Sequence, residues 1–285
     1  MKITILTIFP EMFAPLHESI LGRAQKAGLL EIREVDIRPY AKNKHHNTDD
    51  APYGGGAGMV MLAQPIVDAV RDVQGERFEG RRIYLSPRGQ TLTQRKAEEL
   101  AKEKELILLC GHYEGVDQRA RDLCIDEEIS IGDYVLTGGE LGAMVLADCV
   151  ARLIPGVLGS EQSAQTESFS SGLLEYPQYT RPREFEGLTV PEPLLNGNHA
   201  HVKDWQLEQS LYITLRRRPE LARAYLDGRH LTRKQKRIVD GVFERIRAED
   251  APKGEQAAQD GALEPVQAGE AEERIDGPAA GGQES

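Results

Sequence analysis

Glycine-rich segments follow three strand-like runs of the chain, and their residue types suit the binding of a flat, polar ligand. The segments are residues 87–90, 111–115 and 132–139, each directly after a run rich in apolar residues. Ligands of open α/β sheets sit beyond the carboxyl ends of the strands, and glycine lets the backbone approach a ligand closely. The pattern predicts a pocket for an adenine and its ribose, walled by main-chain N–H and C=O groups. Three unrelated turns are the alternative interpretation.

Two common nucleotide-binding motifs do not occur where they would function. A dinucleotide fold places G-x-G-x-x-G directly after the first strand, where this chain carries Phe9-Pro10-Glu11-Met12-Phe13. The triglycine at 54–56 is followed by Ala57-Gly58-Met59, without the lysine of a phosphate-binding loop. The sequence therefore excludes both of these nucleotide sites.

Cysteines and histidines lack the spacing of a metal site. The three cysteines are Cys110, Cys124 and Cys149, an odd number with no close pair. This pattern favours buried free thiols in a reducing compartment over disulfides or a zinc site. The histidines His45, His46 and His199 form no ligand set either, so we expect no metal ligands.

Strand-like and helix-like runs alternate along the first 150 residues, and they must position the glycine loops. Strands are expected at 3–9, 32–37, 82–86, 105–110 and 124–131, and helices at 11–27, 64–73, 91–104 and 140–150. Thr137 and Glu140 have capping-box spacing before the last of these helices. The alternation predicts an α/β core with a parallel sheet covered on both faces. Residues 40–62 have no period, and a loop of that length is usually functional.

The remaining residues change character twice. Residues 155–198 are rich in Gly, Pro and Ser, which indicates a linker. Three helical runs follow from about residue 202, and Thr232 and Gln235 have capping-box spacing at the last. We therefore expect an α/β domain at 1–160, a flexible linker at 161–198, a basic helical domain at 199–248 and a disordered acidic tail at 249–285.

The net charge of −11 conceals an uneven distribution of charge along the chain. Residues 250–285 hold nine acids and two bases, whereas residues 200–247 hold twelve Lys/Arg and six Asp/Glu. The basic stretch favours contact with a polyanion such as RNA, with a solvated basic face as the alternative. No run approaches the ~18 apolar residues of a membrane span, and the N-terminal run resembles a first strand rather than a secretory signal. We expect a cytoplasmic protein.

Seven runs of residues are more specific than any single loop. They are FPEMF at 9–13, PYGGGAGM at 52–59, YLSPRG at 84–89, CGHYEGVD at 110–117, SIGDYVLTGGE at 130–140, IPGVLG at 154–159 and LNGNHA at 195–200. In this order they resemble the motifs of the TrmD family, the bacterial tRNA (guanine-N1)-methyltransferases, from the first strand to about residue 245. The resemblance implies a SPOUT-type parallel sheet with a deep trefoil knot, an exception to the rule of unknotted chains, plus a small all-α C-terminal domain.

The resemblance also implies a cofactor and an assembly. S-adenosylmethionine would be the methyl donor, held in a bent shape by the three glycine loops of a homodimer whose active sites are completed by the partner subunit. The cofactor-binding residues would be Tyr84, Leu85, Ser86, Pro87, Gly89, Gly111, Tyr113, Glu114, Gly115, Ile131, Gly132, Asp133, Tyr134, Val135, Leu136, Gly138 and Gly139. Among them, Asp133 could face the sulfonium, and an ordinary turn aspartate is the alternative.

The implied reaction is methylation of N1 of guanosine 37, beside the tRNA anticodon, when guanosine also occupies position 36. N1 carries a proton, so a base must remove it while negative charge builds on O6; a carboxylate and a nearby cation are the minimum set. In the family these are an aspartate in an Asp-Ser-Phe stretch and an arginine ending the preceding helix. The matching positions are Glu167 and Arg152. Glutamate has similar basicity and one more methylene.

Substrate contacts are expected from two regions, with the anticodon stem-loop as the partner. The residues are Asp49, Asp50, Phe169, His199, Arg216 and Arg217. The two aspartates could accept hydrogen bonds from a guanine edge, with a turn as the alternative.

The sequence leaves open whether a magnesium ion assists. It also leaves two other functions open, a non-catalytic tRNA-binding module, favoured by the glutamate at 167, and a SPOUT methyltransferase acting on rRNA.

Overall fold

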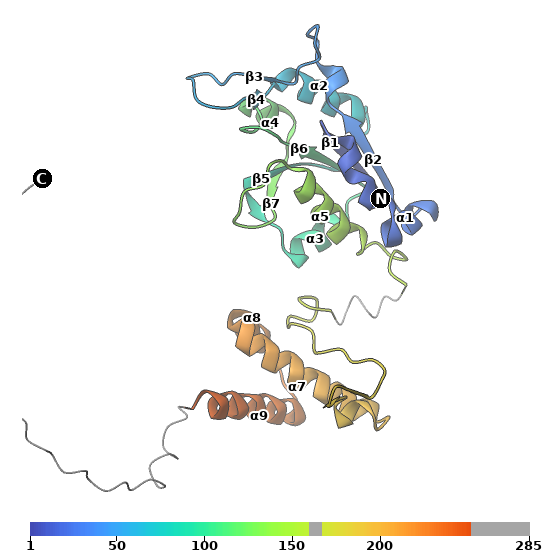
Figure 1. Cartoon of the computed structure of the whole chain (residues 1–285), viewed down its shortest axis with the longest axis vertical. Helices are drawn as coiled ribbons and strands as arrows, with labels where there is room; N and C mark the ends of the chain where they lie inside the picture. The colour runs from blue at the N-terminus through green and yellow to red at the C-terminus, as the bar shows by residue number, and fades with distance from the viewer. Residues whose placement is uncertain (160–166, 252–285) are drawn as a thin grey trace, which may run out of the picture.

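The computed structural model describes residues 1–159 and 167–251, and its core is a five-stranded parallel sheet (Figure 1). The strand order is β2-β1-β6-β5-β7, and each pairing is parallel. The strands are β1 (Lys2–Thr7), β2 (Glu31–Asp36), β5 (Arg81–Thr91), β6 (Glu105–Cys110) and β7 (Glu127–Ser130). The predicted α/β class with a parallel sheet is confirmed. The trefoil knot stays a prediction.

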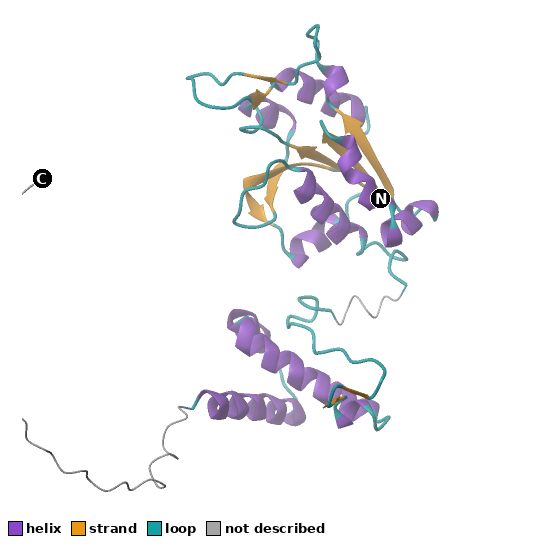
Figure 2. Cartoon of the chain, in the orientation of Figure 1, coloured by secondary structure: helices purple, strands orange, loops and turns teal. Residues whose placement is uncertain are grey.

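Helices cover both faces of this sheet, because each inner strand is apolar on both sides (Figure 2). Along β6, Leu106 and Leu108 face one buried cluster while Ile107 and Leu109 face the other. The first cluster is completed by η1 (Pro10–His17), α1 (Ser19–Lys26), α3 (Gln94–Leu100) and α5 (Glu140–Ala151). The second is completed by α2 (Ala63–Gln74) and α4 (Gln118–Cys124).

Several predicted elements differ from the structure in their bounds or their caps, among them the helix expected at 91–104, which is limited to Gln94–Leu100. The single helix expected at 11–27 is instead η1 followed by α1, because Pro15 lies inside the first and Ser19 has a positive φ of 53°. The strand expected at 124–131 begins only at β7, since α4 extends to Cys124. The helix at 140–150 has Gly139 as its N-cap without a side-chain cap, so the capping box predicted for Thr137 and Glu140 is wrong.

Strand β5 is longer than the predicted 82–86 because it separates from its partner β7 and then pairs with β7 again. Ile129 of β7 pairs with both Leu85 and Gln90, so residues 86–89 bulge out between the two registers. A Cβ at Gly89 would lie 2.4 Å from the Glu128 carbonyl carbon, so glycine is required where the two backbones rejoin. The bulge places residues 86–88 at the end of the sheet where β6 and β7 also terminate.

The aperiodic segment 40–62 is a loop that docks on the turn after β6. The turn η2 (Arg38–Tyr40) leads into it, and within it β3 (Asp49–Asp50) pairs with β4 (Val60–Met61). The Met61 amide donates to the Gly115 carbonyl at 2.9 Å, and the Glu114 amide donates to the Met59 carbonyl at 2.9 Å. The loop is therefore held against residues 111–115.

The C-terminal unit is helical, as the sequence predicts. Its helices α7 (His199–Arg217), α8 (Pro219–Leu226) and α9 (Arg233–Asp250) pack around Leu173, Leu211, Val239 and Val242. The capping box predicted at Thr232 and Gln235 is confirmed at the start of α9. Ahead of these helices lie the hairpin of β8 (Glu184–Phe185) and β9 (Leu188–Thr189) and the turn η3 (Glu192–Leu194).

Two regions of the predicted organisation lie outside the described residues. They are 160–166, at the start of the expected linker, and 252–285, nearly all of the expected acidic tail. None of the described helices combines the length and the apolar character that crossing a bilayer requires.

Leu108 in the central strand tests the placement of this core. Leu108 is fully buried, whereas Leu123 on α4 is 63% exposed. Leu108→Ala is expected to lower the free energy of unfolding by about 2–5 kcal/mol because it leaves a cavity, and Leu123→Ala to change it by less than about 0.5 kcal/mol. Urea unfolding followed by circular dichroism measures both. Equal losses in the two variants would contradict the burial of Leu108 in this core.

Candidate active site

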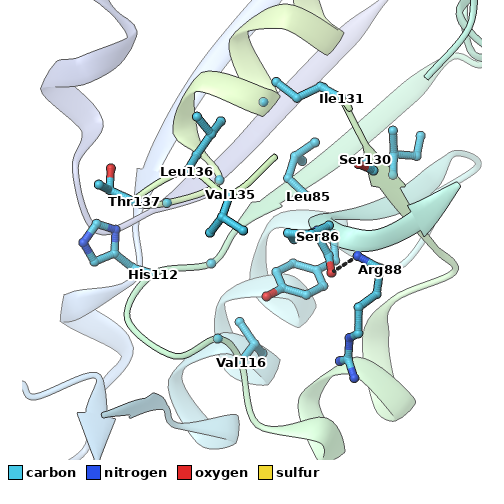
Figure 3. A pocket seen from close by; sticks show the side chains of 18 of the residues that line it. Leu85, Ser86, Arg88, His112, Val116, Ser130, Ile131, Val135, Leu136 and Thr137 are labelled. Carbon is cyan, nitrogen blue, oxygen red and sulfur yellow. Dashed lines mark hydrogen bonds between the residues drawn. The ribbon is translucent and has the colours of Figure 1, made fainter. Parts of the chain in front are cut away.

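A cavity of about 510 Å³ lies beyond the carboxyl ends of β5, β6 and β7 (Figure 3). Its walls are the three glycine-rich segments predicted from the sequence, with flanking residues of the strands. The 86–88 bulge, the 111–115 turn and the 132–139 loop thus meet at one edge of the sheet. Most of the predicted cofactor residues line this cavity; the exceptions are Gly89 and Asp133.

Glycines allow the three segments to come this close. A Cβ at Gly139 would lie 2.9 Å from Cys110 Cα and 3.0 Å from the Gly111 nitrogen, so the loop and the strand end touch backbone to backbone. The Gly139 amide donates to the Gly111 carbonyl at 2.8 Å. A Cβ at Gly111 would in turn lie 2.7 Å from the Tyr84 hydroxyl oxygen. Larger residues at these positions would separate the walls.

The two predicted residues outside the lining have other positions. Gly89 closes the backbone contact between β5 and β7, and Asp133 is exposed on the 132–139 loop. Seven lining residues were not among those predicted: Arg88, His112, Val116, Ile129, Ser130, Thr137 and Gly142. Six of these lie within or beside the recognised sequence runs, so the runs could have been used to predict them as lining residues. Gly142 lines the cavity because α5 starts at the cavity wall.

Acidic and phenolic groups border the cavity on the side of the 40–62 loop. Asp49 lies beside the Tyr113 hydroxyl, and burial raises the pKa of that hydroxyl, with the charge and hydrogen bond of Asp49 raising it further. Asp50, the second residue of β3, accepts a hydrogen bond from the Ala51 amide at 2.7 Å. Asp49 thus neighbours Tyr113, which is itself part of the cavity lining.

Arg152 and Glu167 form a two-pronged ion pair. Arg152 Nη1 donates to Glu167 Oε2 at 2.6 Å, and Nη2 donates to Oε1 at 2.9 Å. The pKa of Glu167 is lowered because these hydrogen bonds stabilise its carboxylate, and the pKa of Arg152 is raised by the same contact. The sequence placed these two residues together, and the structure joins them.

This ion pair does not reach the cavity of its own chain. Gly139 and Gly142 line the cavity at the first turn of α5, whereas Arg152 is the C-cap of the same helix. At 1.5 Å per residue, the 12 residues of α5 separate the two ends by about 18 Å. Phe169, beside the ion pair, is 47% exposed and also lies outside the cavity lining.

The remaining predicted substrate residues lie on the helical unit. His199 begins α7 after the Asn198 cap and is exposed. Arg216 and Arg217 lie in the last turn of α7, where Arg216 pairs with Asp250 at 2.5 Å. The aromatic residues of this unit are partly buried: Tyr212, Tyr225 and Phe243 pack against its core, and Trp205 contacts the rings of Tyr176 and Tyr179.

Side chains suited to metal binding are dispersed in the described chain. Within 1–159 and 167–251, no three His, Cys, Asp or Glu residues are grouped to hold an ion. The thiols of Cys110, Cys124 and Cys149 are free. Burial raises the pKa of Cys110 well above its ordinary value, so this thiol stays protonated beside the cavity.

The comparisons with known proteins agree with the geometry. The family model of tRNA (Guanine-1)-methyltransferase TrmD matches residues 1–224. A tRNA (guanine-N(1)-)-methyltransferase of Halalkalibacterium halodurans is 57% identical over 244 residues, which cover 85% of this chain and 98% of the relative. Relatives with the same name from Geobacillus kaustophilus (57%; 83% of this chain, 96% of the relative) and Pelotomaculum thermopropionicum (55%; 84% and 95%) are similar.

Loss of the Arg152 guanidinium is expected to raise the pKa of Glu167. The carboxylate would lose two charged donors, so protonation would begin at higher pH than in the wild-type chain, closer to the ordinary glutamate value of about 4.3. A ¹³C NMR titration of carboxyl-labelled glutamates compares Arg152→Ala with Arg95→Ala, which removes an exposed charge elsewhere. An unchanged Glu167 midpoint in Arg152→Ala would refute the ion pair.

Proposed function

The chain belongs to the tRNA (guanine-1)-methyltransferase TrmD family, and on this basis we propose that it transfers a methyl group from S-adenosylmethionine to N1 of guanosine 37 in tRNA. Methylation of guanine N1 in tRNA is the activity for which its relatives are named. The observation that carries the proposal is the cavity at the strand ends, built from the loops that the family resemblance assigns to the cofactor.

The residues around the cavity fit S-adenosylmethionine. Glycines at 111, 138 and 139 leave room where any side chain would intrude, so main-chain groups can contact an adenine and ribose. Leu85, Val135 and Leu136 supply apolar wall, and Glu114 supplies a carboxylate for a positively charged ligand. When bound, the donor supplies an electrophilic methyl group and its own neutral leaving group. The protein therefore needs no nucleophilic side chain for this transfer.

Glu167 is proposed as the base that removes the N1 proton. The hydrogen bonds from Arg152 lower its pKa, so the carboxylate is charged and able to accept a proton at neutral pH. The proton passes from N1 to a carboxylate oxygen, and the negative charge left on the guanine is shared with O6. The guanidinium of Arg152 beside this carboxylate can donate a hydrogen bond to O6.

Completion of the site is proposed to require a second copy of the chain. The ion pair and the cavity lie at opposite ends of α5, about 18 Å apart by helix length. The Glu167 of one subunit would then serve the cavity of the other. The alternative, a long movement of 167–169 around the same chain, would break the contact between Arg152 and Glu167.

An exposed apolar face next to the cavity supports the homodimer. It is formed by η1, by one side of α5 and by the 132–139 loop, and η1 packs against α5. Its members are Phe9, Met12, Leu141, Val145, Val135 and Leu136, which are between 36% and 84% exposed. Leu141 and Val145 are four residues apart on α5 and so share one side of the helix. Exposed apolar side chains on neighbouring elements are typical of an interaction site.

The basic helical unit is proposed to bind the anticodon stem. Arg217 at the end of α7 and Arg223 in the last turn of α8 are both exposed, so they could contact phosphates. Asp49, beside Tyr113, is proposed to accept hydrogen bonds from a guanine edge near the cavity. That contact would account for a requirement for guanosine at position 36.

A transfer assay tests the proposed activity. Unmodified tRNA with guanosines at 36 and 37 is incubated with methyl-labelled S-adenosylmethionine and the full chain, with an adenosine-37 tRNA and purified rRNA as parallel substrates. We expect label only on the first tRNA. Tight tRNA binding without label would favour the non-catalytic module suggested by the glutamate at 167, and label on rRNA alone would favour the rRNA enzyme.

Removal of the Glu167 charge is expected to stop the reaction. Glu167→Gln keeps the size of the side chain but cannot accept the N1 proton, so the turnover number should fall by about 10²-fold or more. Affinity for S-adenosylhomocysteine, measured by calorimetry, should stay within about twofold because Glu167 lies outside the cavity. Glu167→Asp, which restores the family residue, is the matched control and should stay active. Wild-type turnover in Glu167→Gln would remove Glu167 from the mechanism.

A further inference from the structure

A buried carboxylate and an unpaired histidine nitrogen face each other at the wall of the cavity. Glu140, the first residue of α5, is only 2% exposed and accepts a hydrogen bond from Thr7 Oγ1 at 3.0 Å. Its other oxygen, Oε2, lies 3.9 Å from His112 Nδ1. That nitrogen is buried and has no hydrogen-bond partner among the described residues.

Burying both groups without a hydrogen bond between them costs free energy of folding. A buried carboxylate requires compensation, and the N-terminal position of Glu140 on α5 gives only part of it. A buried ring nitrogen without a partner loses the hydrogen bond it would make in water. The 3.9 Å separation is too long for a hydrogen bond. If His112 Nδ1 and Glu140 Oε2 moved about 1 Å closer, they would form a hydrogen bond with each other.

The two groups belong to different walls of the cavity. His112 lies in the 111–115 turn, and Glu140 directly follows the 132–139 loop; His112 and Gly138 form an isolated β-bridge between them. A Cβ at Gly138 would lie 2.2 Å from Glu140 Oε2 and 2.6 Å from His112 Nδ1, so glycine keeps this gap clear. The His112 ring also stacks edge-on with Phe9 and Tyr113, at 5.0 and 5.1 Å between centroids.

We propose that His112 and Glu140 are positioning residues that form a latch, closing when the cofactor draws the 111–115 turn and the 132–139 loop together. In the closed state His112 Nδ1–H donates to Glu140 Oε2, while Thr7 holds the other oxygen. Hydrogen bonds of active sites are often long without ligand and shorten in the complex. Because binding and closure are linked, a latch that closes on the ligand strengthens its binding by the same factor.

The latch rests on the proposed use of S-adenosylmethionine, and S-adenosylhomocysteine is the probe. His112→Phe keeps a ring for Phe9 and Tyr113 but loses the nitrogen, and Glu140→Gln keeps the acceptor for Thr7 but loses the charge. Each is expected to weaken binding of the probe by about tenfold in calorimetry, and to raise KM for the donor far more than it lowers kcat. The double variant should bind no more weakly than either single variant. His17→Phe, which alters a histidine paired with Glu34 outside the cavity, should bind like wild type.

A spectroscopic measurement separates the latch from a general structural role. In the ¹⁵N-histidine spectrum of the full chain, the Nδ1 signal of His112 should move to that of a protonated, hydrogen-bonded nitrogen when S-adenosylhomocysteine is added. The same movement should be absent in Glu140→Gln. If Glu140→Gln does not fold, His112→Phe and the wild-type spectrum decide the question.

The outcomes distinguish the two proposals. A wild-type chain that does not bind S-adenosylhomocysteine overturns the proposed function and the latch with it. A wild-type chain that binds, together with a His112→Phe chain that binds within about twofold of it, overturns the latch alone. An Nδ1 signal of His112 that does not move in the wild-type complex also overturns the latch alone. Weakened binding in both single variants without further loss in the double variant supports the latch.

Discussion

Backbone contact at the ends of three neighbouring strands is the constraint on which the rest of this structure depends. Gly139 lies against Cys110, Gly111 lies under the Tyr84 ring, and Gly89 lies against Glu128, each closer than a Cβ would permit. These contacts bring three loops to one edge of the sheet and leave a cavity with main-chain walls. The selectivity expected of such a cavity comes from shape and from fixed amide and carbonyl groups, so binding needs little rearrangement of side chains beyond closure of the His112–Glu140 pair.

The two ends of helix α5 lie beside two different acidic residues. At its N-terminus the buried Glu140 faces the cavity wall, and at its C-terminus Arg152 holds the charged Glu167. The carboxylates near the two ends have different surroundings: Glu140 is shielded from water and lies near a histidine, and Glu167 accepts hydrogen bonds from a guanidinium that lower its pKa. Because the helix is rigid, its length keeps the proposed base away from the cavity of its own chain. The exposed apolar face beside that cavity supplies a surface for the subunit that would bring the base.

The sequence predicted local features well and missed those that depend on distant contacts. Alternating apolar runs predicted the parallel sheet, glycine positions predicted the three cavity loops, and the box at Thr232 predicted the start of α9. The return of β5 to β7 could not be predicted, because it depends on Gly89 meeting a strand 39 residues later. Glu140 has the spacing of a cap partner, yet its side chain turns to Thr7, 133 residues away. Asp133 looked suited to a sulfonium, but nothing local revealed that it would be exposed outside the cavity lining.

The central claim is that each active site combines the glycine-built cavity of one chain with the Glu167 base of the other. Mixing two inactive variants tests it most directly. Gly139→Ala destroys the cavity but keeps Glu167, and Glu167→Gln keeps the cavity but removes the base. If the base acts across the interface, heterodimers formed by refolding an equal mixture contain one intact site. The mixture should then recover about a quarter of wild-type methyl transfer, since half of randomly formed dimers are mixed and each has one of two sites. A mixture no more active than the separate variants would contradict the account, because it would mean that cavity and base act within one chain.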